Sequence, residues 1–78
     1  DIVIFTSSSG NSINHLNAAR FCKKKKFFTI SFTGFGKNKL SRLTNLSMIV
    51  DSKNFNIIEN IHSIWLLMIL DKIKNFKF

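Results

Sequence analysis

A hydroxyl-rich stretch near the start of this 78-residue chain has the residue types best suited to hold an anion. It comprises Ser7, Ser8, Ser9, Gly10, Asn11 and Ser12. An apolar run typical of a buried strand precedes it, and a segment with helical spacing follows it. The amides of a first helical turn point outward, the helix dipole favours negative charge, and glycine allows close backbone approach. The pattern therefore predicts a phosphate-binding loop, and a solvated loop in which Asn11 or Ser12 caps the helix explains the same residues.

Glu59 and His62 form the second candidate constellation, within the last apolar segment. Side chains three residues apart are neighbours on one helix face. A carboxylate beside an imidazole in an apolar setting suits general acid–base catalysis. An exposed or hydrogen-bonded pair near a helix start, where the dipole favours Glu59, explains the same spacing. The spacing by itself favours this second interpretation.

Apolar runs and helical patterns alternate along the chain and predict the elements that must position these residues. Strands are predicted at residues 1–6, 27–32 and 46–50, and helices at residues 12–24, 37–43 and 57–74. Strands separated by helices imply βαβ crossovers, so the predicted fold class is α/β, a three-layer sandwich with a parallel sheet. Ligands of such sheets bind beyond the carboxyl ends of the strands, where residues 7–12, 33–36 and 51–56 would lie.

The formal net charge of +8 raises the possibility of a nucleic-acid or membrane partner. The basic residues are spread, and their dense run at residues 23–26 ends a predicted helix, where cations complement the dipole. The sequence has no helix-turn-helix, zinc pattern or aromatic–basic platform, so a solvated surface is favoured over nucleic-acid binding. The longest apolar run, residues 64–70, is too short to cross a membrane, and a cytoplasmic protein is expected.

Two further patterns concern packing. Cys22 is the single cysteine and follows Ile13, Leu16 and Ala19 on one helical stripe, which predicts a buried structural thiol. The last helix is apolar nearly all round, so we expect it to be buried on several sides or to pack against another subunit.

A chain that starts with Asp1 inside a strand is interpreted as a fragment whose upstream half is missing.

Three segments carry a resemblance to a known family. Residues 7–14, Ser-Ser-Ser-Gly-Asn-Ser-Ile-Asn, look like the Ser-Thr-Ser-Gly-Asn-Ser-x-Asn loop of the SIS (sugar isomerase) domain. Residues 30–34 look like its second strand and Thr-Gly turn, and residues 59–62, Glu-Asn-Ile-His, are similar to its Gln-Glu-x-His helix start. The whole chain, residues 1–78, resembles the C-terminal half of such a domain, closest to the phosphoheptose (sedoheptulose 7-phosphate) isomerases.

The resemblance implies a flavodoxin-like α/β half-domain and the aldose–ketose isomerisation of a sugar phosphate, in heptose and surface-polysaccharide biosynthesis. It implies phosphate ligation by the serine hydroxyls, with the Gly10 and Asn11 amides assisting. It also implies a homotetramer assembled through the last helix, with zinc used in part of the family. The fragment by itself is expected to be inactive, because the family's other active-site loop lies upstream.

Three positions depart from the family pattern. Glu59 stands where the family has a catalytic Gln, and Leu67 stands where it has a catalytic His. Either Glu59 or His62 takes over the proton transfer, or the chemistry differs from that of the family. The remaining alternative is a non-catalytic module that binds sugar phosphate or associates with a replication initiator. Lys26 occupies a helix-ending position at which glycine is common, and a left-handed lysine there would cost about 1 kcal/mol.

Overall fold

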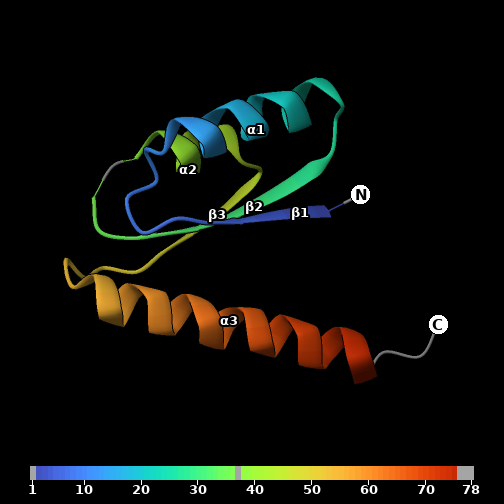
Figure 1. Cartoon of the computed structure of the whole chain (residues 1–78). Helices are drawn as coiled ribbons and strands as arrows, with labels where there is room; N and C mark the ends of the chain where they lie inside the picture. Colours follow the sequence, from blue (N-terminus) through green and yellow to red (C-terminus); the bar gives the residue numbers. More distant parts are fainter. Residues whose placement is uncertain (1, 37, 76–78) are drawn as a thin grey trace.

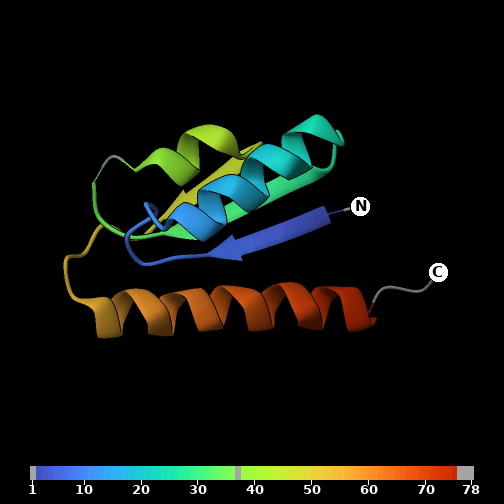
Figure 2. The ribbon, with the colours of Figure 1, turned by 45° about the horizontal axis from the view of Figure 1, so that its top comes forward.

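Within the residues that the structure describes, three parallel strands alternate with three helices. A computed structural model describes residues 2–36 and 38–75, with β1 (Ile2–Thr6), α1 (Ile13–Lys24), β2 (Phe28–Thr33), α2 (Lys39–Leu43), β3 (Leu46–Ile49) and α3 (Phe55–Asn75). The strands form one sheet in the order β1-β2-β3. Helices α1 and α2 cover one face of this sheet and α3 lies on the other (Figure 1). A second view shows the same three layers (Figure 2), and the predicted α/β fold with a parallel sheet is confirmed.

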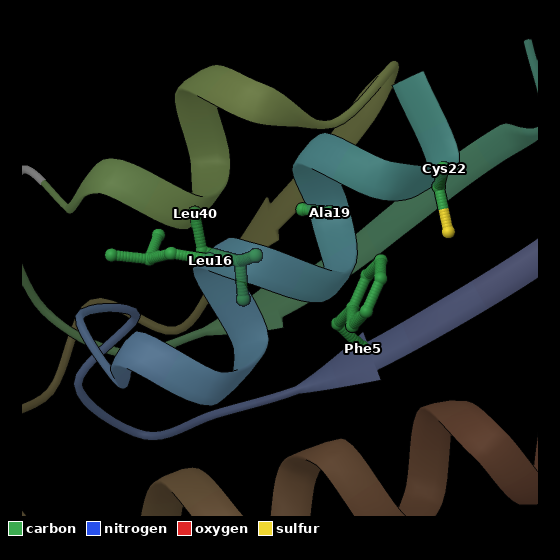
Figure 3. Packing of buried hydrophobic residues seen from close by; sticks show 5 residues of the cluster. All are labelled: Phe5, Leu16, Ala19, Cys22 and Leu40. Atoms are coloured by element: carbon green, nitrogen blue, oxygen red, sulfur yellow. The ribbon is translucent and has the colours of Figure 1, made fainter. Parts of the chain in front are cut away.

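The layer between α1, α2 and the sheet contains a cluster of buried apolar side chains (Figure 3). Its buried members are Phe5, Leu16, Ala19, Cys22 and Leu40. Cys22 is only 7% exposed, which confirms the buried thiol. Ile13 is 71% exposed, so its assignment to the buried stripe was wrong. The reason is geometric. Ile13 lies six residues before Ala19, so its side chain points about 120° away from that of Ala19 around the helix axis.

The central strand β2 presents side chains of different character to the two helical layers. On the α3 side the Phe32 ring is fully buried, with its centroid 5.4 Å from that of Trp65. On the other side, alternate residues are buried hydroxyls, each bonded to a residue next to α2. Asn45 Oδ1 accepts from Thr29 Oγ1 (3.0 Å), Ser31 and Thr44 share a bond (2.8 Å), and Thr33 Oγ1 accepts from Asn38 Nδ2 (3.0 Å). These bonds satisfy the buried polar groups and dock the short helix α2 onto the sheet.

Helix α1 ends in a Schellman motif with Lys26 in the left-handed conformation, at φ = 60°. The Phe27 amide donates to Cys22 O (3.0 Å) and the Lys26 amide donates to Lys23 O (3.2 Å), which is the paired bonding of that motif. Phe27 also packs against the core cluster that contains Cys22. The left-handed lysine expected from the sequence is therefore present.

We predict that Lys26→Gly raises the free energy of unfolding by about 1 kcal/mol, because glycine adopts a positive φ without a Cβ penalty. Urea unfolding followed by circular dichroism measures the change. Lys24→Gly is the matched control, since it places glycine in the last turn of α1 and should instead destabilise the chain by about 0.5–1 kcal/mol. A loss of stability in Lys26→Gly would contradict the prediction.

Several element boundaries differ from the sequence predictions. Helix α3 begins at Phe55, two residues early, because Asn54 Oδ1 caps it by accepting from the Asn56 amide (2.9 Å). Strand β2 covers residues 28–33 rather than 27–32, because Phe27 belongs to the helix cap. Strand β3 stops one residue early, at Ile49. Asp1 and Lys37, with which a predicted strand and helix begin, lie outside the described residues.

Helix α3 is buried along one side, against β2, rather than on several sides as predicted. Ile58 and His62 lie on the buried side. The exposed apolar side chains of α3 are Phe55, Ile57, Ile64, Leu67, Met68, Leu70 and Ile73. Packing of this surface against a second copy stays a prediction. None of the helices described is long and apolar enough to span a membrane.

Candidate functional site

The loop at residues 7–12 connects the carboxyl end of β1 to α1. The Ser7 amide donates to Phe32 O (2.9 Å), which extends the pairing of β1 with β2 by one residue. Gly10 O accepts from the Leu40 amide (2.9 Å). The loop is therefore anchored to the central strand on one side and to α2 on the other.

Hydroxyl groups of this loop bond its own amides. The Gly10 amide donates to Ser7 Oγ (3.0 Å), and the Asn11 amide donates to Ser9 Oγ (3.2 Å). Gly10 supports this turn with φ = 69°, which favours glycine. Ser12 is the N-cap of α1, as the second sequence interpretation has it, but its side chain makes no capping bond. The first-turn amides of α1 thus keep their capacity to donate to an anion.

Asn38 lies beneath the loop and is 3% exposed. Its Oδ1 accepts from the Ser41 amide (2.8 Å), which caps α2, and its Nδ2 donates to Thr33 Oγ1 (3.0 Å). The space a Cβ on Gly10 would need is filled by the Asn38 side chain. One buried amide therefore joins the loop, α2 and the end of β2.

We predict that Asn38→Ala lowers the free energy of unfolding by about 2–4 kcal/mol. The change removes the α2 cap, which contributes about 1 kcal/mol, and strands a buried hydroxyl on Thr33. Urea unfolding measures the loss. Asn17→Ala is the control, because Asn17 is exposed and accepts only a 3.3 Å bond from Arg20. Equal stability of the two variants would refute this role of Asn38.

His62 and Glu59 lie at the same edge of the sheet as the loop at residues 7–12. They belong to helix α3, which lies on the opposite face of the sheet from α1. His62 is 5% exposed, and its Nε2 lies 2.9 Å from Thr33 O, to which it donates as the Nε2–H tautomer. Its ring also packs against Phe32 and Trp65, with both centroid distances at 5.9 Å. Glu59 lies nearly one turn earlier and is exposed. His62 is therefore fixed by the fold, whereas the Glu59 carboxylate is accessible.

A hollow of about 490 Å³ lies between the loop and α3. Its lining residues are Thr6, Ser7, Ser8, His15, Glu59, His62, Ser63 and Leu66. Two loop serines and both acid–base candidates thus share one cavity, although they come from opposite layers of the sandwich. We call this cavity the serine hollow.

The remaining loop residues lie elsewhere. Ser9 and Asn11 line a second hollow of about 330 Å³, together with Lys53. The Lys53 ammonium lies 4.8 Å from the Phe35 ring centroid, so this cation is held near the loop. Gly10 and Ser12 line neither hollow. Ser8 is the loop residue that lines both hollows.

His15 is an ionisable lining residue of the serine hollow that sequence reasoning missed. It is the third residue of α1, its ring meets the Phe5 ring edge-on, and its Nδ1 is buried without a hydrogen-bond partner. A buried Nδ1 without an acceptor favours the tautomer with the proton on Nε2, since a buried donor without a partner costs free energy. The signal in the sequence was a histidine in the first turn after the serine loop.

A metal requires more ligands than this site brings together. Within residues 2–36 and 38–75, no group of three His, Cys, Asp or Glu side chains is arranged to hold a metal ion. At the serine hollow, His62 also commits its Nε2 to Thr33 O. The described residues therefore do not by themselves fit the zinc site that the resemblance raised.

Comparison with known proteins identifies one informative relative. No family model and no solved structure matches the chain. The chain is 36% identical over 62 residues, 80% of its length, to a phosphoheptose isomerase of Aneurinibacillus thermoaerophilus. The aligned part is 31% of that protein, so the chain spans about a third of its relative's length. At this coarse level, the chain is similar to a sugar isomerase.

Proposed function

We propose that this chain forms the phosphate-binding part of an aldose–ketose isomerase that acts on sedoheptulose 7-phosphate or a closely similar ketose phosphate. The observation that carries the proposal is the serine hollow, in which Ser7 and Ser8 face the same cavity as Glu59 and His62. The name of the similar protein, phosphoheptose isomerase, supports the same reaction class.

The phosphate of the substrate binds at the loop. The hydroxyls of Ser7 and Ser8 donate to its oxygens, and the α1 dipole favours its charge. Because Ser7 Oγ already accepts from the Gly10 amide, its proton remains available for a phosphate oxygen. A loop held by its own hydrogen bonds loses little conformational entropy when the ligand binds.

Glu59 is the general base of this proposal. It takes a proton from C1 of the ketose while the C2 carbonyl oxygen gains one, which forms the enediol. Return of a proton to C2 and loss of the O1 proton then complete the aldose. Glu59 suits this role because it is accessible at the hollow, whereas the Nε2 of His62 is engaged with Thr33 O. His62 then acts as a positioning residue that holds α3 against β2.

The direct test is turnover of sedoheptulose 7-phosphate by the whole protein. Ser8→Ala should raise KM about tenfold with a smaller effect on kcat, because one hydrogen bond to a charged phosphate is lost in the ground and transition states alike. Ser41→Ala is the control, since Ser41 bonds Asn38 and lines neither hollow beside the loop. Absence of turnover over a panel of sugar phosphates would reject the enzyme proposal.

A non-catalytic sugar-phosphate-binding module is the second candidate. Leu67 occupies the position of the family's catalytic His; it is 65% exposed and does not line the serine hollow. Calorimetry that detects binding of sedoheptulose 7-phosphate without turnover would favour this candidate. Pull-down of a replication protein by the whole protein would favour its initiator-associating form.

A further inference from the structure

A third hollow lies at the opposite edge of the sheet from the serine loop, where β2 and β3 begin. Its volume is about 400 Å³. Its lining residues are Lys23, Lys26, Phe27, Phe28, Thr29, Arg42, Leu43, Thr44 and Asn45. We call it the basic hollow. Because parallel strands all begin at this edge, it is separated from the serine hollow by the length of the strands.

The charged residues that line the basic hollow are all positive. Three of its lining residues, Lys23, Lys26 and Arg42, are cationic, and no acidic residue of the described chain lines it. Within the described segments, none of the three cations forms an ion pair. Cations that converge without acidic neighbours raise the local concentration of an anion.

Asn45 adds a fixed donor to these charges. Its Oδ1 accepts from both the amide (2.8 Å) and the hydroxyl (3.0 Å) of Thr29, and its own amide donates to Thr29 Oγ1 (3.0 Å). The Thr29 amide can only donate, so the side-chain oxygen of Asn45 must face it. The NH2 group of Asn45 then remains available to donate to a ligand in the hollow.

A helix C-terminus carries partial negative charge on its free carbonyls, and three carbonyls near the end of α1 are already hydrogen-bonded. The two Schellman bonds occupy the carbonyls of Cys22 and Lys23, and the Lys25 amide donates to the carbonyl of Phe21. The same motif holds Lys26 at a positive φ, so the backbone carries a strained lysine at the rim of the hollow.

We propose that the basic hollow binds the diphosphate group of a small molecule, at a site separate from the sugar-phosphate site. Lys23, Lys26 and Arg42 supply positive charge, and the Asn45 NH2 donates a directional hydrogen bond to a phosphate oxygen. The three cationic side chains and the Asn45 side-chain amide can together donate hydrogen bonds to an anion that has several charged oxygens, as a diphosphate does. This inference does not depend on the proposed isomerase activity.

Inorganic pyrophosphate is the probe, titrated into the 15N-labelled protein at constant ionic strength. Saturable shifts of the Thr29 and Asn45 amides are expected. Lys26→Gly and Arg42→Gln should each weaken binding about fivefold, because each removes one exposed positive charge of the protein that would attract the ligand. Because Lys26→Gly is expected to stabilise the fold, its weaker binding would not reflect unfolding.

Two control variants separate this site from alternatives. Lys39→Gln removes the same charge at the opposite edge of the sheet, and Ser8→Ala alters the serine loop; both should leave the pyrophosphate affinity at Thr29 and Asn45 unchanged. Equal weakening by Lys39→Gln would show charge attraction without a site and overturn the proposal. Shifts confined to residues 7–12 would overturn it as well.

Discussion

Gly10→Ala is expected to lower the free energy of unfolding by about 2–5 kcal/mol and to distort the serine loop. Alanine at φ = 69° costs about 1–2 kcal/mol. Its Cβ would also overlap the Asn38 side chain, which is buried and hydrogen-bonded on both sides and so cannot move away cheaply. Overpacking of this kind adds about 1–3 kcal/mol. Urea unfolding measures the loss, and the amide shifts of residues 7–12 report the distortion.

Gly36→Ala is the matched control for this prediction. Gly36 also has a positive φ, of 88°, but a Cβ placed on it would meet nothing within 4 Å. It therefore carries the conformational cost without the overlap, and we expect a loss of about 1–2 kcal/mol. If both variants lost the same stability, contact between Gly10 and Asn38 would not determine the loop conformation.

Glu59→Gln is expected to lower kcat of the whole protein by about 10²–10⁴-fold with little change in KM. Glutamine keeps the size and hydrogen-bonding capacity of Glu59 but cannot accept the C1 proton, and general bases typically contribute this much. Steady-state kinetics with sedoheptulose 7-phosphate separates kcat from KM. The exposed position of Glu59 makes a large effect on stability unexpected, which unfolding of the variant verifies.

Ser63→Ala is the control for Glu59→Gln within the same hollow. Ser63 lines the cavity and its hydroxyl donates to the backbone oxygen of Glu59 (3.0 Å), so it does not reach the Glu59 carboxylate through this bond. Nearly unchanged kcat is expected. An active whole protein in which Glu59→Gln kept normal kcat would place the base elsewhere and contradict its assignment to Glu59.

Local elements were predictable because their signals are local. Among the described residues, apolar periodicity located the three strands and three helices within about two residues, and the alternation of the two types implied a parallel sheet. The left-handed conformation of Lys26 was raised by the family resemblance, because Lys26 stands at a helix-ending position where glycine is common. The exposure of Ile13 was missed because a three-residue spacing rotates gradually around a helix away from the buried side. The early start of α3 was missed because it depends on the hydrogen bond that Asn54 accepts, which apolar periodicity does not report.

The arrangement of side chains at the candidate site could be predicted only in part from the sequence pattern. Parallel topology placed the serine loop and the start of α3 at one edge of the sheet, so their proximity could be expected. That Ser7 and Ser8 share a hollow with Glu59, while Ser9 and Asn11 face another, depends on how two layers pack across β2.

By itself, the sequence determined which segments form strands and helices and which loop carries the hydroxyls. Only the tertiary structure decided what those side chains meet. The buried hydroxyls on β2 align α2 beneath Gly10, and the bond from His62 to Thr33 O sets α3 against the sheet. Such contacts join residues far apart in the chain, and their geometry arises from the packing of whole elements, which no short sequence window contains.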